Sequence, residues 1–229
     1  LQCAKTHEVR VVGVAFHVGS GNGDLSAYTT AIREARMVFD LAISMGFSME
    51  VLDLGGGLPG SQGDEAKFAA IAATMKPLLD ELFPDATIIA EPGRFFAAAS
   101  QTVVASVFGE RVLGDDDDDD DEDENGSTEM QYYIEDGAYH SFNCLVFDHA
   151  HPTLHLVQPR DTEGDTYVST IWGPTCDSMD VILRQEKLPR LEDGDWLYFP
   201  NMGAYTTAAA TTFNGFGTHR REFITTIKF

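Results

Sequence analysis

The fold is decided by the stretch VLDLGGGLPG (residues 51–60), in which a short apolar run ends in three consecutive glycines. An apolar β-branched run, a glycine turn and a following helical pattern together indicate a parallel βα unit. Glycine amides can approach an anion closely, and the N-terminus of the next helix adds a favourable dipole. Because the stretch matches neither common nucleotide-binding glycine motif, it predicts another kind of phosphate cradle, or a tight turn without a ligand.

Similar units flank this stretch on both sides. The polar ends of the three predicted strands should meet at one edge of a parallel sheet, where α/β proteins place their sites. The predicted strands are residues 11–17, 51–54 and 87–90, and the predicted helices are residues 27–45, with Ser26 as N-cap, and residues 65–82, which Pro77 should kink or break.

After residue 99 the pattern becomes strand-like with intervening turns, which predicts an α/β domain over residues 1–100 and an all-β domain over residues 101–229. Ten acidic residues in a row (115–124) cannot pack without neutralisation, so residues 114–128 are expected to form a disordered loop. The predicted strands of the second domain are residues 102–108, 131–135, 144–147, 154–157, 167–171, 195–199 and 223–229.

Composition narrows the function classes. The formal net charge of −22 repels phosphate backbones and anionic lipid, and no basic stripe reverses it, so neither nucleic acid nor a membrane is an expected partner. No apolar stretch approaches the roughly 18 residues of a spanning helix. Three cysteines with no paired spacing favour a reducing compartment, and we expect a cytoplasmic protein.

Charged and polar side chains follow the predicted strands. In IIAEPGRFF (residues 88–96), Glu91 can hold a ring nitrogen protonated. Arg94 either binds phosphate or forms a plain structural ion pair with Glu91. His17 ends the first strand near Ser20, where it is either functional or a satisfied polar residue. In IWGPTCDSMD (residues 171–180), Cys176 lies in a polar turn and is a possible proton donor or nucleophile.

Two other groups of residues predict no chemistry. Cys144 stands in a predicted strand and is expected to be inert packing. The histidines of DHAHPTLH (residues 148–155) lack the helical zinc spacing and have no matching Cys/His pair elsewhere, so no metal site is expected.

Six motifs in order, AFHVGSG, LDLGGGLPG, EPGRFF, DGAYHSFNCLVFDHAHP, IWGPTCDSMD and NMGAYTTAAATTFNGF, resemble the eukaryotic ornithine decarboxylases over nearly the whole chain. These are pyridoxal-phosphate enzymes of the alanine-racemase-like fold. The resemblance implies the C-terminal part of a (β/α)8 TIM-like barrel, followed by a β-sheet or β-barrel domain. It also implies a homodimer with active sites shared between subunits.

The resemblance assigns roles to individual residues. His17 would stack on the ring of pyridoxal 5'-phosphate, and Glu91 would pair with its pyridine nitrogen. Phe147 and Asp148 would line the distal amine of L-ornithine, with Asp177 contributed by the partner subunit. Cys176, also from the partner, would donate a proton to the substrate carbon after carbon dioxide leaves. The implied cofactor-binding residues are His17, Ser20, Gly55, Gly56, Gly57, Glu91, Pro92, Gly93, Arg94 and Tyr205.

The lysine that binds the cofactor covalently in this family lies before the AFHVGSG motif, and Lys5, Lys67, Lys76, Lys187 and Lys228 stand in none of the matching contexts. We therefore expect a fragment, inactive alone, of an enzyme that converts L-ornithine to putrescine, with antizyme as a further candidate partner. The alternatives are a lysine, arginine or diaminopimelate decarboxylase, and a non-catalytic regulatory protein resembling the antizyme inhibitors.

Overall fold

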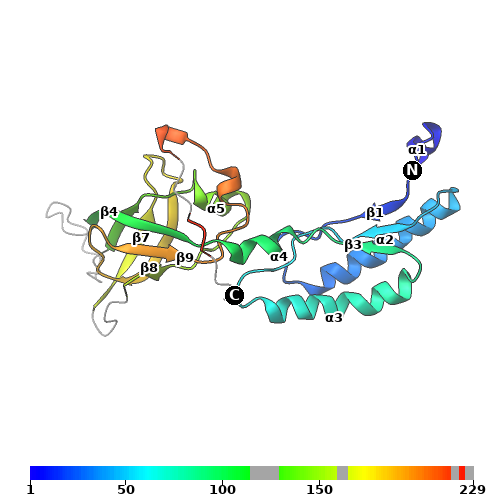
Figure 1. The fold of residues 1–229 in the computed structure, drawn as a ribbon, viewed down its shortest axis with the longest axis horizontal. Helices are drawn as coiled ribbons and strands as arrows, with labels where there is room; N and C mark the ends of the chain where they lie inside the picture. The colour runs from blue at the N-terminus through cyan, green and yellow to red at the C-terminus, as the bar shows by residue number, and fades with distance from the viewer. Residues whose placement is uncertain (114–128, 159–164, 218–221, 225–229) are drawn as a thin grey trace, which may run out of the picture. The chain divides into compact units, whose positions relative to one another are not determined.

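The computed structural model describes residues 1–113, 129–158, 165–217 and 222–224, and the chain divides into two compact units, Leu1–Ser100 and Gln101–Phe229 (Figure 1). The predicted acidic loop at residues 114–128 lies outside the described residues. Within them, no helix has the length and apolar character that crossing a bilayer requires.

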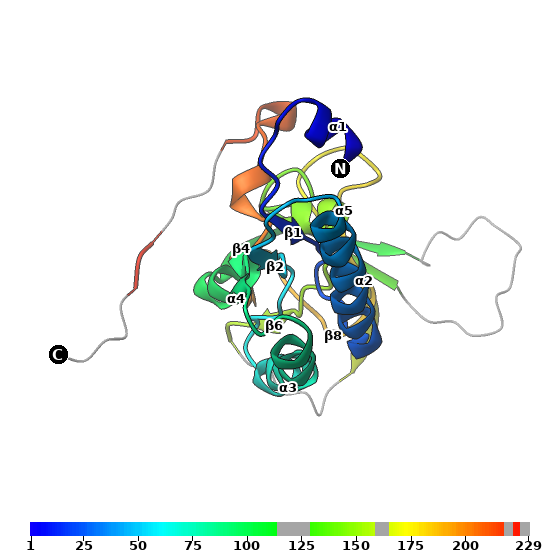
Figure 2. The same ribbon diagram turned by 90° about the vertical axis from the view of Figure 1, so that its right-hand side faces the viewer.

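The first unit is built on a parallel sheet with strand order β1-β2-β3. Both helices that connect its strands lie next to each other, as Figures 1 and 2 show. The unit is therefore a piece of a βα-repeat architecture. Its elements are α1 (Gln2–Thr6), β1 (Gly13–Ala15), α2 (Leu25–Ser44), β2 (Val51–Asp53), α3 (Glu65–Leu82), β3 (Thr87–Ile89), α4 (Gly93–Ala97) and the 3-10 turn η1 (Ala98–Ser100).

Helix α2 buries one stripe of side chains at helical spacing. Phe39 of this stripe meets Phe83 edge to face, with ring centroids 5.3 Å apart. The central strand supplies the fully buried Leu52 to the same core. The remaining core members include Tyr28, Ile32, Ala35, Leu58, Ile71 and Met75.

Two local predictions for these helices need correction. Helix α2 begins at Leu25, and its N-cap is Asp24, whose carboxylate accepts the Ser26 N–H at 2.8 Å. Asp and Ser cap equally well, so composition alone did not separate the two positions. Pro77 lies inside α3 and does not end it. Pro77 has no N–H to donate to the carbonyl of Ala73. Both residues are exposed, so water can donate to that carbonyl instead.

In the part that the structure describes, the second unit forms one sheet with strand order β6-β9-β4-β5-β7-β8. Strands β5 and β7 are parallel, whereas every other pairing in it is antiparallel. Its core is apolar and continuous, with Phe142 meeting Phe199 edge to face. The strands are β4 (Val103–Leu113), β5 (Glu129–Ile134), β6 (His155–Leu156), β7 (Thr166–Trp172), β8 (Val181–Pro189) and β9 (Trp196–Phe199).

The second unit departs from the sequence prediction in three places. The run Cys144–Phe147 is helix α5, not a strand, although Cys144 is buried in the core at 2% exposed. A four-residue apolar run carries too little periodicity to separate the two states. Strand β8 was not predicted, because charged residues interrupt its apolar pattern. Residues 222–224 form no strand, and residues 225–229 lie outside the described residues.

Tyr28 provides a test of the first core. Its ring is 2% exposed, and in the described structure its hydroxyl has no hydrogen-bond partner. Removing a buried unsatisfied hydroxyl relieves its desolvation cost, so Tyr28→Phe should raise the free energy of unfolding by about 1 kcal/mol. Chemical denaturation measures this.

Tyr132→Phe is the matched control, because the hydroxyl of Tyr132 accepts the Leu191 N–H at 3.0 Å. This second substitution should destabilise the protein. A Tyr28→Phe variant that is also less stable than the parent would contradict the assignment.

Candidate cofactor and substrate site

Backbone hydrogen bonds tie together the carboxyl ends of the three parallel strands. The Phe16 N–H donates to the Asp53 carbonyl at 3.1 Å, and the Glu91 N–H donates to the Gly55 carbonyl at 2.8 Å. The Leu54 N–H reaches the Ile89 carbonyl at 2.9 Å. The residues that follow each strand are thereby held at one edge of the sheet.

The three glycines at this edge leave no room for a side chain. A Cβ at Gly55 would lie 2.1 Å from the Phe16 carbonyl oxygen, and one at Gly56 would lie 2.6 Å from that of Glu91. At Gly57, where φ is +79°, a Cβ would approach the Gly19 oxygen to 2.5 Å. The close backbone approach, as well as the positive φ, therefore requires glycine here.

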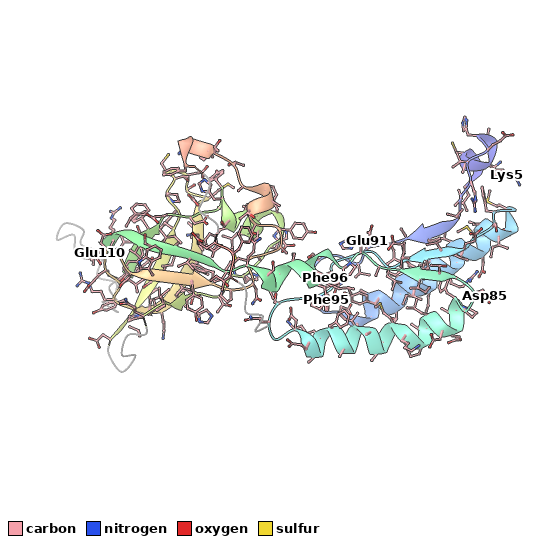
Figure 3. The ribbon with its side chains drawn as sticks, in the orientation of Figure 1. Lys5, Asp85, Glu91, Phe95, Phe96 and Glu110 are labelled. Carbon is pink, nitrogen blue, oxygen red and sulfur yellow. The ribbon has the colours of Figure 1, made fainter. Side chains whose placement is uncertain are left out.

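Polar side chains from the first and third loops join this cradle. The Gly56 N–H donates to Nδ1 of His17 at 3.2 Å. Nε of Arg94 donates to Oγ of Ser20 at 2.8 Å, across a separation of 74 residues. Glu91 is exposed and lies two residues after the end of β3 (Figure 3). The structure thus brings the predicted residues of the first unit together around one strand edge.

A second group of predicted residues lies in the turn that follows β7. The hydroxyl of Tyr139 donates to Oδ2 of Asp177 at 2.5 Å, and the Met179 N–H donates to Oδ1 at 2.8 Å. The Tyr139 hydrogen bond is the main reason that the pKa of Asp177 lies below its usual value. The same bond raises the pKa of Tyr139. Asp177 is therefore held as a carboxylate.

The turn is anchored by a carboxylate that sequence reasoning did not single out. Asp180 is fully buried, and its two oxygens accept the Ala138 N–H at 2.7 Å and the N–H and hydroxyl of Thr175 at 3.0 and 2.7 Å. A Cβ at Gly137 or Gly173 would lie 2.3 or 2.1 Å from Oδ1 of Asp180. In the sequence, the available signal was the pair Gly137 and Gly173, whose missing side chains leave room for the Asp180 carboxylate.

Cys176 is exposed on this turn, and its Sγ accepts a hydrogen bond from Nδ2 of Asn214 at 3.6 Å. Phe213 stacks on the ring of Tyr139 with centroids 4.2 Å apart. The segment that carries Phe213 and Asn214 therefore contacts both Tyr139 and the Cys176 turn. Sequence reasoning quoted these two residues and Tyr139 within motifs but gave them no role.

The other predicted residues of the second unit lie in two further turns. Phe147 ends helix α5 and is 69% exposed, and Asp148 caps that helix with its N–H on the Cys144 carbonyl at 3.0 Å. Tyr205 is 55% exposed and has a left-handed backbone with φ of +55°. Each unit thus contributes its own group of predicted residues.

The fold has counterparts in known proteins. The family model "Pyridoxal-dependent decarboxylase, pyridoxal binding domain" matches residues 1–98, and "Pyridoxal-dependent decarboxylase, C-terminal sheet domain" matches residues 61–203. This chain belongs to the pyridoxal-dependent decarboxylases. The partial barrel and sheet domain expected from the sequence are confirmed by these decarboxylase matches.

Relatives in this decarboxylase family carry several names. The chain is 46% identical to ornithine decarboxylase of Mus musculus over 94% of its length, covering 48% of that protein. It is 48% identical to antizyme inhibitor 2 of Xenopus laevis, with the same coverage of each chain. It also resembles the structure of arginine decarboxylase of Paramecium bursaria Chlorella virus bound to agmatine, with 35% identity and a TM-score of 0.80 over 93% of this chain and 54% of that one.

The chain therefore spans about half the length of the relatives that it matches. The cofactor of this decarboxylase family is pyridoxal phosphate, and the first unit fits it. The glycine cradle, which added Cβ atoms would fill, leaves backbone amides near a strand edge. Ser20 and Arg94 can add donors for a phosphate, and Glu91 supplies a carboxylate for a ring nitrogen.

The cradle can be tested at Gly57. Its substitution by alanine forces a Cβ against the Gly19 carbonyl oxygen and Cε1 of His17, 2.5 and 2.9 Å away. Gly63→Ala is the matched control, because φ there is +90° but no atom lies within 4 Å of the added Cβ. Gly63→Ala should cost only the left-handed strain, about 1–2 kcal/mol, and Gly57→Ala should cost clearly more in denaturant unfolding. Equal costs would contradict the close-packed cradle.

The Tyr139–Asp177 hydrogen bond predicts a pH-dependent contribution to stability. Since the pKa of Asp177 is lowered in the folded protein, the stabilisation is complete above the unfolded value of about 3.9 and is lost as the pH falls through the folded value. Tyr139→Phe should therefore lower the urea midpoint at neutral pH, and the difference from the parent should shrink at about pH 3 and below.

Tyr133→Phe serves as the control for this titration, since its hydroxyl donates to the uncharged Gln131 at 3.4 Å. Its effect on the urea midpoint should not change over the same pH range. A Tyr139→Phe difference that stays constant with pH would show that the Asp177 carboxylate is not the group involved.

Proposed function

We propose that this chain is the C-terminal portion of an ornithine decarboxylase, which converts L-ornithine to putrescine with pyridoxal phosphate. The observation that carries the proposal is the Cys176–Asp177 turn, in which an exposed thiol stands beside a carboxylate kept ionised by Tyr139. A proton donor next to a binding site for a cationic amine is what decarboxylation of a diamino acid requires. The ornithine decarboxylase names of several relatives support the same substrate.

Each residue type suits one task in that reaction. Pyridoxal phosphate, when bound, supplies an electron sink for the electron pair left by departing carbon dioxide. Glu91 would keep the ring nitrogen protonated, and His17 would stack on the ring. Asp148 and Asp177 bind the distal ammonium group of the substrate. Cys176 donates the proton that the substrate carbon takes up after carbon dioxide leaves.

The substrate preference within the family follows from this charge arrangement. Two carboxylates suit a side chain that ends in an amine, whereas diaminopimelate would need a cation at the same place. Lysine is one methylene longer than ornithine, a difference worth roughly 1 to 3 kcal/mol of discrimination. One solved relative at 35% identity, from Vibrio vulnificus, is described as a lysine/ornithine decarboxylase complexed with cadaverine. Lysine is therefore the expected side substrate.

The proposal includes an assembly and a location. The site residues are divided between two units, which suits a homodimer in which Cys176 and Asp177 serve the partner's cofactor. The cysteines in the described structure are free thiols, in keeping with a reducing, cytoplasmic compartment. Antizyme is proposed as a protein partner.

A regulatory protein is the second candidate, because antizyme inhibitor 2 is among the relatives at 48% identity. A protein that only sequesters a partner has no need of a proton donor or of a cofactor carboxylate. Cys176, Asp177, Asp148, Glu91 and Arg94 are all present here, which favours the enzyme.

The experiment joins this chain to the amino-terminal half of the Mus musculus ornithine decarboxylase, because the chain spans about half of that relative. Release of carbon dioxide is measured with ornithine, lysine and arginine. Ornithine should be preferred. A fusion that binds antizyme and pyridoxal phosphate but releases no carbon dioxide would favour the regulatory alternative.

The same fusion tests the proton donor. Cys176→Ala should lower turnover by about 10² to 10⁴ and lower the share of putrescine among the products, because the thiol that would direct the proton to the substrate carbon is missing. The balancing products would be an aminoaldehyde and the amine form of the cofactor, which would retain the substrate's amino group. Single-turnover product analysis measures this ratio. Cys3→Ala, which also removes an exposed thiol, is the control and should leave the products unchanged. Putrescine alone at the parental rate from Cys176→Ala would remove Cys176 from this role.

A further inference from the structure

A buried amide joins two loops that carry residues of the candidate site. Asn143 is 1% exposed, and its Nδ2 donates to the carbonyl oxygen of Thr206 at 2.5 Å and to that of His140. The bond to Thr206 spans 63 residues. The loop that follows β5 is thereby tied to the loop that follows β9.

Asn143 is buried because its two side-chain N–H groups donate hydrogen bonds to buried carbonyls. Oδ1 of Asn143 is buried and has no hydrogen-bond partner in the described residues, which is a cost that an apolar side chain would avoid. The amide orientation is fixed, because exchanging Oδ1 and Nδ2 would place an oxygen against two carbonyl oxygens. An asparagine is therefore kept for its two N–H groups.

Thr206, whose carbonyl oxygen accepts the hydrogen bond from Asn143, immediately follows Tyr205 in the chain. Tyr205 has φ of +55°, a backbone conformation that a non-glycine residue keeps only when its surroundings hold it. Thr206 itself is buried, and its hydroxyl donates to the Met202 carbonyl at 2.7 Å. The exposed Tyr205 is thus bonded in the chain to Thr206, a buried residue that two hydrogen bonds hold in place.

Asn143 also lies at the start of helix α5, which ends at Phe147. The next residue, Cys144, is packed in the core. One side chain therefore sets the relative position of the Tyr205 turn and of the helix that presents Phe147 and Asp148.

We propose that Asn143 is a positioning residue for the cofactor phosphate: through the Thr206 carbonyl, it holds Tyr205 where its phenol can bind that phosphate. This inference rests on the proposed function and on the family resemblance, which places Tyr205 among the residues that bind the cofactor. Asn143 itself touches neither cofactor nor substrate.

The test compares Asn143→Asp, Tyr205→Phe and the double variant in the fusion described above. Asn143→Asp keeps the side-chain size but replaces the N–H groups by an oxygen that repels both carbonyls. The dissociation constant of pyridoxal phosphate is measured by titrating the cofactor-free protein. Each single change should weaken binding by about tenfold, and the double variant should bind no more weakly than the worse single variant.

A second readout needs no cofactor. Amide hydrogen exchange of residues 201–207 should accelerate in Asn143→Asp while exchange in β7 and β8 is unchanged. Ser169→Ala is the control for general core damage, since Ser169 is fully buried and its hydroxyl donates within β7 to the Tyr167 carbonyl. It should lower stability without changing cofactor affinity. If Asn143→Asp does not fold, Thr206→Val removes the Met202 bond alone and should loosen the same loop.

The outcomes separate this inference from the proposed function. Additive losses of affinity, or unchanged exchange at residues 201–207, overturn the role of Asn143 even when the fusion decarboxylates ornithine. An unchanged dissociation constant in Tyr205→Phe also overturns it, because the phosphate contact is then absent. A parent fusion that binds cofactor with the predicted coupling but does not decarboxylate ornithine leaves Asn143 in place and refutes the proposed reaction.

Discussion

The candidate cradle depends on backbone hydrogen bonds that hold the carboxyl ends of three parallel strands together. Each strand is only three residues long, so these bonds, which continue beyond the strands, extend the sheet into the loops. The loops can approach so closely because Gly55, Gly56 and Gly57 carry no side chain. The positions of His17 and Glu91 follow from this constraint, since both are attached to the backbone that it fixes.

Much of this arrangement could be predicted from the sequence, because it follows from local patterns. Alternation of apolar runs with helical spacing located β1, β2, β3 and both connecting helices to within a few residues. The errors arose where two residue types serve equally well, as at the α2 cap, or where a pattern was too short or too charged to interpret. The apolar run at α5 and the charged strand β8 are examples.

The contacts that support the site could not be predicted from local sequence patterns. Tyr139 and Asp177 are 38 residues apart in sequence, and Ala138 and Asp180 are 42 apart. Neither pair has a spacing that a helix or a hairpin would predict. Cys176 could be singled out because its own turn is polar, but the groups that hold its turn in place become visible only in the folded chain.

The parallel pairing of β5 with β7 has a consequence for the segment that joins these two strands. Neighbouring parallel strands cannot be joined by a tight turn, so a long crossover leaves β5, contributes β6 at the far edge of the sheet and then returns to pair β7 beside β5. That crossover carries Tyr139, Asn143, Phe147 and Asp148. Because topology imposes the length of this crossover, exposed positions within it, such as Phe147 at 69% exposed, can be substituted without breaking the pairing of β5 with β7.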